Sequence, residues 1–306
     1  MNKPSTISFD ELVKTITMFW IDRDLEKEMS KEIENMVNSL STKLTNVNTR
    51  QGIQEYIRSD KDALSNILGL MEISEERFKR IISMLRRERK FVFSTEWSLE
   101  RTQEMLISDA QMMEDVCELL LEGATSERYK RKIPDFFREG FKIDDATMAR
   151  LTDHNELTRL AKSKMEVRYN SSVSNIVTRK IEEAIKLTCD LEGLTYVKNK
   201  PIKEFKEFDK PFAFAIPDAA HARIIVDCSY NITTSSTQTK YADKIEQAHK
   251  IIRNGALPII IVNVLEGAGW IGRQSDLKRI VDYSDYALNL SSIGMIDQII
   301  RYGMEA

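Results

Sequence analysis

Apolar residues recur at helical spacing through the first half of the chain. From about Phe9 to Arg168 the sequence is rich in polar residues, and apolar positions such as Leu12, Ile16 and Phe19 lie three or four residues apart. Proline, which interrupts helices, is nearly absent there. The pattern predicts an all-helical N-terminal region over residues 1–168. Its later helices are expected at Gln51–Arg58, Lys61–Met71, Ser74–Lys90, Leu99–Glu122 and Ala146–Lys164.

The pattern changes after the segment KMEVRYNSSVSN. Apolar residues at helical spacing predict a helix over Val173–Asp190. The short apolar segments that follow are typical of strands: GLTYVKN, KPFAFAI and RIIVDCSY. A second helix is expected to end at Gly255. The continuous apolar run ALPIIIVNVLE that follows is typical of a strand buried on both faces. Another helix, the strand YALNLSSI and a short final helix complete the chain. Residues 169–306 are therefore expected to form an α/β (α+β) core with a mixed central sheet flanked by helices.

Composition excludes several classes of protein but does not identify the function. Charged residues make up 30% of the 306 positions and the net charge is −3, so any nucleic-acid surface must be a local basic patch. The three cysteines have no CxxC spacing, which argues against a disulfide scaffold and against a zinc site. No signal-peptide pattern and no run of about 20 apolar residues is present, so a cytoplasmic location without membrane insertion is expected.

The segment KPFAFAIPDAAHARIIVDCSYN carries the candidate chemistry. Residues two apart face the same side of a strand, so Asp227 and Ser229 project together. A turn at Pro217 to Ala222 makes the two apolar runs antiparallel partners and places Asp218 in the turn. Phe212 and Ala213 are then expected opposite Asp227. Asp218 is too far along the strand to share one metal ion with Asp227.

The hairpin and its neighbours resemble the PD-(D/E)xK nuclease fold. The segments KPFAFAI, IIVDCSYNITTSSTQTKYA and PIIIVNVLEGAGWIGRQSDLKRI are similar to type II restriction endonucleases of the DpnII/MboI kind, and the resemblance covers about residues 172–293. It implies that Asp227 is a metal-binding acid and that Ser229 stands where this superfamily usually has lysine. The first metal-binding acid falls on Ala213, where an aspartate is expected.

Two explanations account for Ala213. Natural loss of the acid would make the protein a degenerate nuclease that binds DNA without cutting it. Alternatively, alanine was introduced in place of aspartate, and the parent protein is active. We favour the second explanation, because Asp227 and its surroundings have not decayed. Either way, the chain with Ala213 is expected to bind Mg²⁺ poorly and to cleave little.

Further residues are candidates for the same site. Glu183, on the first helix of the core, is either an additional metal-binding acid or a solvated charge. Lys240 and Gln238 are candidates to replace the lysine missing at Ser229, and Lys240 is equally well explained as an exposed side chain. Hydroxyl groups at the start of the following helix suit a phosphate and also make an ordinary helix cap. These are Thr233, Thr234 and Ser235.

Basic clusters in the helical half are candidate DNA-binding faces. One lies in the segment RFKRIISMLRRERK and the other in ERYKRKIPDFF. Solvated helix faces, balanced by neighbouring glutamates, are an equally good explanation. The candidate DNA-binding residues are Arg77, Arg80, Arg86, Arg87, Arg89, Lys90 and Arg131. Trp270, in the Gly-rich turn EGAGWIG, either packs against the sheet edge or approaches DNA, and packing is the favoured expectation.

These expectations combine into one leading hypothesis. The protein is expected to be a type II restriction endonuclease that hydrolyses double-stranded DNA with Mg²⁺, in a form disabled at Ala213. A palindromic site has two strands to cut, so a homodimer is expected, with residues 1–168 serving DNA binding or dimerisation. The alternatives are a catalytically silent DNA-binding protein on a nuclease fold and a helical interaction protein.

Overall fold

The computed structural model describes residues 2–91 and 95–305. Its contacts divide the chain into two units, one of residues Arg23–Val167 and one that joins Met1–Asp22 to Arg168–Ala306. We call them the helical unit and the sheet unit. The expected boundary at residue 168 coincides with one division between the units. The first 22 residues, however, group with the sheet unit and not with the helices that follow them.

The helical unit contains only helices among its described residues, as the sequence pattern predicts. The core includes Leu44, Ile57, Phe78 and Leu119, all fully buried. Its helices are α2 (Arg23–Lys43), α3 (Arg50–Ser59), α4 (Ala63–Leu70), α5 (Glu75–Glu88), α6 (Leu99–Ser108), α7 (Ala110–Glu122), α8 (Glu127–Lys130), α9 (Asp135–Arg138), α10 (Asp145–Leu151) and the first part of α11 (His154–Glu192).

Two predicted helix boundaries are wrong. The helix predicted over Leu99–Glu122 is two helices, because Asp109 ends α6 and its carboxylate accepts hydrogen bonds from the first amides of α7. The helix predicted over Ala146–Lys164 is interrupted between α10 and α11. From His154, α11 continues without a break to Glu192, through the segment KMEVRYNSSVSN where the sequence pattern changes, since that segment contains neither proline nor glycine.

The sheet unit is built on a five-stranded mixed sheet in the order β1-β2-β3-β4-β5. β1, β2 and β3 are antiparallel neighbours, whereas β4 and β5 run parallel to β3. The strands are β1 (Val197–Lys198), β2 (Phe214–Ile216), β3 (Ile224–Tyr230), β4 (Ile260–Glu266) and β5 (Tyr286–Leu288). The other elements are α1 (Phe9–Thr15), η1 (Lys203–Phe205), α12 (Ser236–Asn254), α13 (Ala268–Ile271), α14 (Gln274–Tyr283), η2 (Leu290–Met295) and α15 (Ile296–Glu305).

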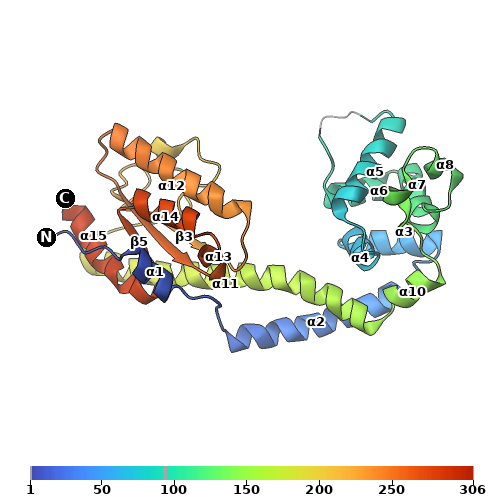
Figure 1. Cartoon of the computed structure of the whole chain (residues 1–306), viewed down its shortest axis with the longest axis horizontal. Helices are drawn as coiled ribbons and strands as arrows, with labels where there is room; N and C mark the ends of the chain where they lie inside the picture. Colours follow the sequence, from blue (N-terminus) through green and yellow to red (C-terminus); the bar gives the residue numbers. More distant parts are fainter. Residues whose placement is uncertain (1, 92–94, 306) are drawn as a thin grey trace. The chain divides into compact units, whose positions relative to one another are not determined.

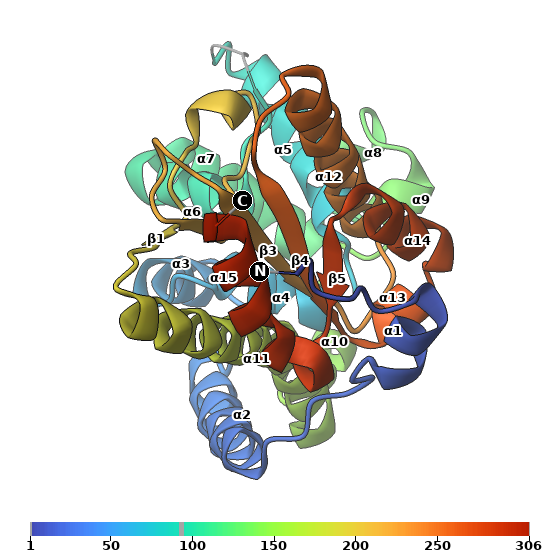
Figure 2. The ribbon, with the colours of Figure 1, turned by 90° about the vertical axis from the view of Figure 1, so that its left-hand side faces the viewer.

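Helices cover both faces of this sheet. α12 and α14 lie on one face and the C-terminal part of α11 lies on the other (Figures 1 and 2). Ile225 and Ile261 pack in the cluster of α12 and α14. On the opposite face, Thr178 of α11 lies 3.4 Å from the thiol of Cys228. Odd-numbered residues of β3 therefore face α12, and even-numbered residues face α11.

The N-terminal segment belongs to the sheet unit because it completes its core. Leu12 and Ile16 are buried in the same cluster as the α12 residues. The buried carboxylate of Glu266 accepts hydrogen bonds from the amides of Thr17 (2.6 Å) and Leu290 (2.7 Å), so it ties this segment to the C-terminal part of the chain. The two chain ends lie close together on one side of the unit (Figure 2).

No helix in the described part of the chain is long and apolar enough to cross a membrane.

Separate truncations test this division. A fragment of residues 23–167 is expected to unfold cooperatively on its own, because its core lies within the fragment. A chain that lacks residues 1–22 is expected to lose on the order of 3–6 kcal/mol from its sheet unit, because Leu12 and Ile16 are no longer buried. Urea denaturation followed by circular dichroism measures both. A non-cooperative transition for residues 23–167 would contradict the division.

Candidate functional site

The β2–β3 register places Ala213 opposite Asp227. Phe214 pairs with Val226 and Ala215 with Ile225, so the next pair along the hairpin is Ala213 and Asp227. The Ala213 amide also donates a hydrogen bond to the Asp227 carboxylate. The register expected from the sequence is confirmed. The methyl group of Ala213 contributes no ligand atom at this position.

Asp227 is a buried carboxylate whose oxygens are all engaged. The residue is 7% exposed. Its Oδ2 accepts a hydrogen bond from Lys244 Nζ at 2.7 Å, and its Oδ1 accepts one from the Cys228 amide at 3.1 Å. Burial raises the pKa of Asp227, and the Lys244 ammonium and the backbone amides oppose that rise.

Lys244, which the sequence hypotheses did not include, is the side chain bonded to the Asp227 carboxylate. It projects from α12, donates a second hydrogen bond to the carbonyl of Pro211 (3.2 Å) and lies 4.3 Å from the centre of the Phe212 ring. The ammonium is thus enclosed by a carboxylate, a carbonyl and an aromatic face. One signal was available in the sequence, because Lys244 lies three residues after Tyr241 and four before Ala248, two positions of the apolar stripe of α12.

Polar side chains extend from Asp227 onto β4. Asn263 is the β4 partner of Asp227, and its Oδ1 accepts a hydrogen bond from the buried Tyr241 hydroxyl at 2.8 Å. Burial raises the pKa of Tyr241 well above its usual value, and the Asp227 charge adds to the rise. The Asn263 side-chain amide donates to the Ser284 hydroxyl at 2.7 Å. These contacts hold Asn263 in one orientation beside Asp227.

The Ser229 side chain forms its hydrogen bond within the loop after β3 and not with Asp227. It lies on the Asp227 side of β3 by strand alternation. Its hydroxyl accepts a hydrogen bond from the Asn231 side-chain amide at 2.6 Å, and its carbonyl accepts one from the Trp270 indole at 3.4 Å. These bonds hold the end of β3 against the loop that follows β4.

The structure does not bring Glu183 to Asp227. Glu183 is solvent-exposed on α11, and α11 packs on the face of the sheet that carries Cys228. Its neighbour Glu182 points to the sheet edge, where it pairs with Lys198 at 2.6 Å. The interpretation of Glu183 as a solvated charge fits this position, and its interpretation as a ligand beside Asp227 does not.

Gln238 and Lys240 also stand apart from the Asp227 carboxylate. Gln238 is buried and closes a capping box on α12, in which its Oε1 accepts a hydrogen bond from the Ser235 amide at 2.7 Å. Lys240 is solvent-exposed. Among the described residues of α12, Lys244 is the cation bonded to Asp227.

The loop after β3 interlocks with the loop after β4. Gly267 has φ +102°, and a Cβ there would lie 2.2 Å from the Asn231 carbonyl oxygen. A Cβ on Gly269 would lie 2.5 Å from the Thr233 carbonyl oxygen. Glycine is thus required at both positions of the EGAG turn. Trp270 is fully buried and its ring lies 5.9 Å from that of Tyr241, so the predicted packing of Trp270 is confirmed.

The hydroxyl residues of this loop remain on the surface. Thr233, Thr234 and Ser235 are exposed. Ser235 is the N-cap of α12, and its hydroxyl accepts a hydrogen bond from the Thr237 amide at 3.2 Å. The helix-cap explanation therefore holds for Ser235. A phosphate contact at the two threonines stays a prediction.

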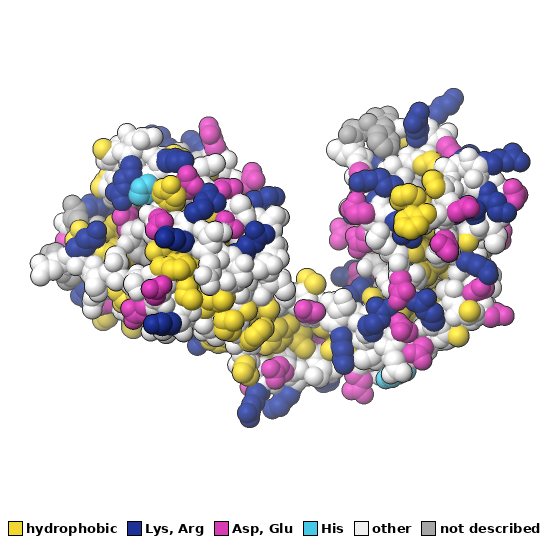
Figure 3. Space-filling model, viewed as in Figure 1, with side chains coloured by type: hydrophobic (Ala, Val, Ile, Leu, Met, Phe, Trp, Pro, Cys, Tyr) yellow, Lys and Arg dark blue, Asp and Glu magenta, His cyan; other side chains and the backbone are white. Residues whose placement is uncertain are grey.

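Several basic residues of the helical unit already have acidic partners. Arg80 pairs with Glu76 (3.3 Å) and with Glu96, and Arg89 pairs with the buried Asp115. An arginine held by a carboxylate must exchange that partner to contact a DNA phosphate. On the face shown in Figure 3, basic and acidic side chains alternate over this unit.

Arg86 is buried and is not available to DNA in this structure. Its guanidinium lies 4.0 Å from the centre of the Trp97 ring and donates to the Thr95 carbonyl at 2.9 Å. The expectation that Arg86 is a surface DNA ligand is wrong, because helical spacing did not separate the inward face of α5 from its outward face. Arg77 lies over the exposed Phe136 ring, at 5.6 Å from its centre.

Three exposed cations among the proposed DNA-binding residues have no ion-pair partner among the described residues. Within residues 2–91 and 95–305, no ion-pair partner is found for Arg87, Lys90 or Arg131, and all three side chains belong to exposed residues. Together with Arg77, for which the described residues provide no ion-pair partner either, they can meet a phosphate without breaking an existing ion pair.

The residues present do not fit a resident Mg²⁺. Magnesium prefers several oxygen ligands, usually including carboxylates. Nowhere in the described chain do three His, Cys, Asp or Glu side chains gather as a metal site. Asp227 is neutralised by Lys244, and Ala213 offers no oxygen from its side chain. In this form of the chain the site is a closed ion pair.

One protein-family model matches the C-terminal half of the chain. Residues 154–302, which span α11 to α15 and include Asp227 and Lys244, match the family model of the BanI C-terminal domain. This is a family of type II restriction endonucleases. The C-terminal half of the chain is similar to a restriction endonuclease domain. The match to the BanI C-terminal domain supports a restriction enzyme, a nuclease in the broad sense, and hence DNA binding. No curated protein matches the chain.

Removing Lys244 tests the ion pair. Lys244→Met is expected to lower the free energy of unfolding by about 3–5 kcal/mol, because it leaves a buried carboxylate without a counter-charge. Asp227→Asn combined with Lys244→Met is expected to recover part of this loss. Urea denaturation of the single and double variants measures it.

The pH dependence of the same variant gives a second measurement. Without Lys244, burial raises the Asp227 pKa in the folded state above its unfolded value, opposed only by the backbone amides. The folded state then binds the proton more tightly, so stability of Lys244→Met is greatest below the unfolded pKa and falls as pH rises towards the folded pKa. A pH-independent loss would show that the carboxylate is not the cause.

Proposed function

We propose that the protein is a type II restriction endonuclease on a PD-(D/E)xK core that binds double-stranded DNA at a specific site and is disabled for hydrolysis by Ala213. The observation that carries the proposal is the pairing of Ala213 with Asp227 across the β2–β3 hairpin. The match of this region to the BanI C-terminal domain supports the assignment. The succession of α11, three antiparallel strands, α12 and a parallel strand is the order expected of that core.

Charge explains why residue 213 matters. With alanine at 213, the charges of Asp227 and Lys244 cancel, so no net charge attracts a divalent cation. An aspartate at 213 would add a second carboxylate on the neighbouring strand, opposite the first. Two carboxylates and one ammonium leave a net negative charge, which Mg²⁺ can neutralise. We assign Lys244 to the place of the motif lysine that Ser229 lacks.

In a working site of this kind, Mg²⁺ supplies activation of the attacking water and stabilisation of charge on the phosphate. The residues of this chain would hold and orient the reacting groups. Asp227 and an acid at 213 would supply oxygen ligands, and Lys244 would hold the Asp227 carboxylate in position. Cleavage of both strands of a palindromic site calls for a homodimer in the active assembly.

A silent DNA-binding protein is the second candidate function. The enclosed Asp227–Lys244 pair favours it, since the site is stable without any metal. On this hypothesis the sheet unit keeps the restriction-endonuclease fold for recognition alone. A helical interaction protein, the third alternative, would show no duplex affinity at low salt.

Restoring the acid distinguishes the two leading candidates. Ala213→Asp is expected to increase Mg²⁺-dependent cleavage of a defined DNA by about 10²-fold or more, because metal stabilisation of the transition state is worth several kcal/mol. Ala213→Asn is the matched control, with the same shape and no charge. Asp227→Asn in the Ala213→Asp background should abolish the gain. Unchanged inactivity on DNA that the restored protein binds would favour the silent protein.

Surface charge gives a separate prediction for DNA binding. Replacing Arg87, Lys90 and Arg131 by alanine is expected to weaken duplex binding and to reduce the dependence of log K on log salt concentration by roughly one for each lost phosphate contact. Fluorescence anisotropy at several salt concentrations measures both quantities. Arg80→Ala is the control, because Arg80 is held by Glu76 and Glu96. Equal losses in the control and in the triple variant would contradict the assignment.

A further inference from the structure

A cavity of about 270 Å³ lies at the end of the sheet where β3 and β4 begin. Arg223 and Ile260 line it at the starts of these strands, Tyr286 lines it from β5, and Tyr302 and Gly303 line it from α15. It is formed entirely by residues of the sheet unit. Neither the Asp227 ion pair nor the basic clusters of the helical unit contribute to it.

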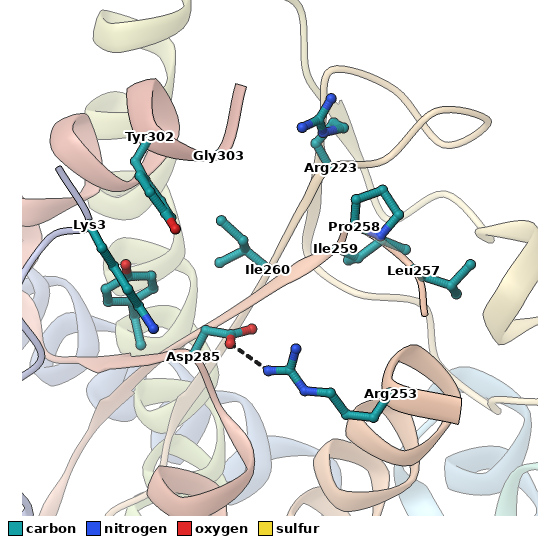
Figure 4. A pocket seen from close by; sticks show the side chains of 11 residues that line it. Lys3, Arg223, Arg253, Leu257, Pro258, Ile259, Ile260, Asp285, Tyr302 and Gly303 are labelled. Carbon is teal, nitrogen blue, oxygen red and sulfur yellow. Dashed lines mark hydrogen bonds and ion pairs between the residues drawn. The ribbon is translucent and has the colours of Figure 1, made fainter. Parts of the chain in front are cut away.

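The chain's two ends meet over this cavity. Lys3 approaches from the N-terminal segment and Tyr302 from the last helix, and Figure 4 shows both side chains beside Ile260. A Cβ on Gly303 would lie 2.8 Å from the Ile224 side chain, so a larger residue there would have to displace the side chains under α15. The close approach places Tyr302 at the cavity wall.

The charges around the cavity are predominantly positive. Lys3, Arg223 and Arg253 line it, with Asp285 as the one acid among the lining residues. The Asp285 carboxylate is already engaged, since it accepts hydrogen bonds from Arg253 (2.8 Å) and from the Ile261 amide (2.9 Å). The described residues provide no acidic partner for Lys3 or for the Arg223 guanidinium. At least two positive charges are therefore left without compensation.

Buried polar atoms at the cavity also lack partners. The Tyr286 hydroxyl and the Arg223 Nε are both inaccessible to solvent, and neither has a hydrogen-bond partner among the described residues. Tyr286 is 1% exposed. Buried donors without partners are rare in folded proteins, because each costs about 1–3 kcal/mol. Tyr286 and Arg223 both line the cavity, so an acceptor bound there would lie next to these unpartnered groups.

We propose that this cavity binds a phosphomonoester group. A phosphate dianion supplies the negative charge that Lys3 and Arg223 lack and acceptor oxygens for the Tyr286 hydroxyl. Leu257, Pro258 and Ile259 form an apolar part of the wall, which suits the less polar portion of a small phosphorylated molecule. The same chemical group occurs in a free nucleoside monophosphate and at the 5′ end of a DNA strand.

Titration of the full-length protein tests this site. Inorganic phosphate and a nucleoside monophosphate are titrated calorimetrically at constant ionic strength, and a 5′-phosphorylated hairpin duplex is compared with its 5′-hydroxyl form. Binding of the two small probes identifies a free ligand. A preference for the phosphorylated hairpin, in the absence of binding by the small probes, identifies a DNA end. Either result supports the phosphomonoester site, and absence of both at millimolar concentrations overturns it.

Two variants locate the binding. Tyr286→Phe removes only the unpartnered hydroxyl, so its melting temperature without phosphate is expected to equal or exceed that of the parent, while affinity falls roughly tenfold or more. Lys3→Met removes an unpaired charge and should weaken binding similarly. Lys278→Met, at an exposed lysine of α14 away from the cavity, is the matched control and should bind as the parent does.

The outcomes separate this inference from the proposed nuclease function. Phosphate affinity that is unchanged in Tyr286→Phe and in Lys3→Met would overturn the assignment of the cavity. Ala213→Asp should leave phosphate binding at the cavity unaffected, because residue 213 does not line it. Failure of cleavage after that repair would leave the cavity proposal intact, and failure of phosphate binding would leave the nuclease proposal intact.

Discussion

A buried carboxylate beside a single ammonium group governs the candidate site. Transferring Asp227 into the interior costs several kcal/mol, and Lys244 offsets that cost only while it stays within hydrogen-bonding distance. The pair joins β3 to α12. The second bond of Lys244, to the Pro211 carbonyl, extends the constraint to the chain entering β2. The Lys244 side chain thus links β3, α12 and the chain entering the hairpin.

Because Asp227 and Lys244 balance each other, the residue at 213 determines the net charge of the site. One lysine balances one aspartate, so a protein with alanine at 213 needs no metal ion to keep Asp227 buried. Two facing carboxylates would repel each other in a poorly solvated place, and one lysine could not neutralise both. A divalent cation would then stabilise the folded protein as well as serve chemistry. On the proposed function, metal affinity and local stability are therefore coupled through residue 213.

Strand register and helix caps in the sheet unit could be predicted from the sequence, because they depend on residues close together in the chain. Alternation of apolar residues fixes the β2–β3 register, and with it the pairing of Ala213 and Asp227, because a one-residue slip would expose the buried face. The apolar run of β4 and the capped stripe of α12 are likewise local signals. Helix boundaries in the helical unit were less predictable, since Asp109 is compatible both with a helix interior and with a cap between two helices.

Long-range partners account for what the sequence did not predict. The grouping of residues 1–22 with the sheet unit depends on Glu266, 249 residues away from Thr17, and no local pattern encodes that bond. Lys244 was overlooked for the same reason. Its helical position shows that it borders the apolar stripe, but not that the stripe packs over Asp227. Arg86 and Gln238 are polar residues whose burial follows only from their neighbours.

Charge compensation differs between the two ends of this sheet. Around Asp227, the carboxylate, the ammonium, the amide of Asn263 and the hydroxyl of Tyr241 all find partners within the chain. Around the cavity at the start of β3, a buried hydroxyl and a buried guanidinium nitrogen find none. Packing alone does not explain why polar groups are paired around Asp227 and unpaired at the cavity, because strands of the same sheet form both sites. On the phosphomonoester proposal, a group from outside the chain satisfies the unpartnered atoms at the cavity, whereas the Asp227 carboxylate already has its counter-charge within the chain.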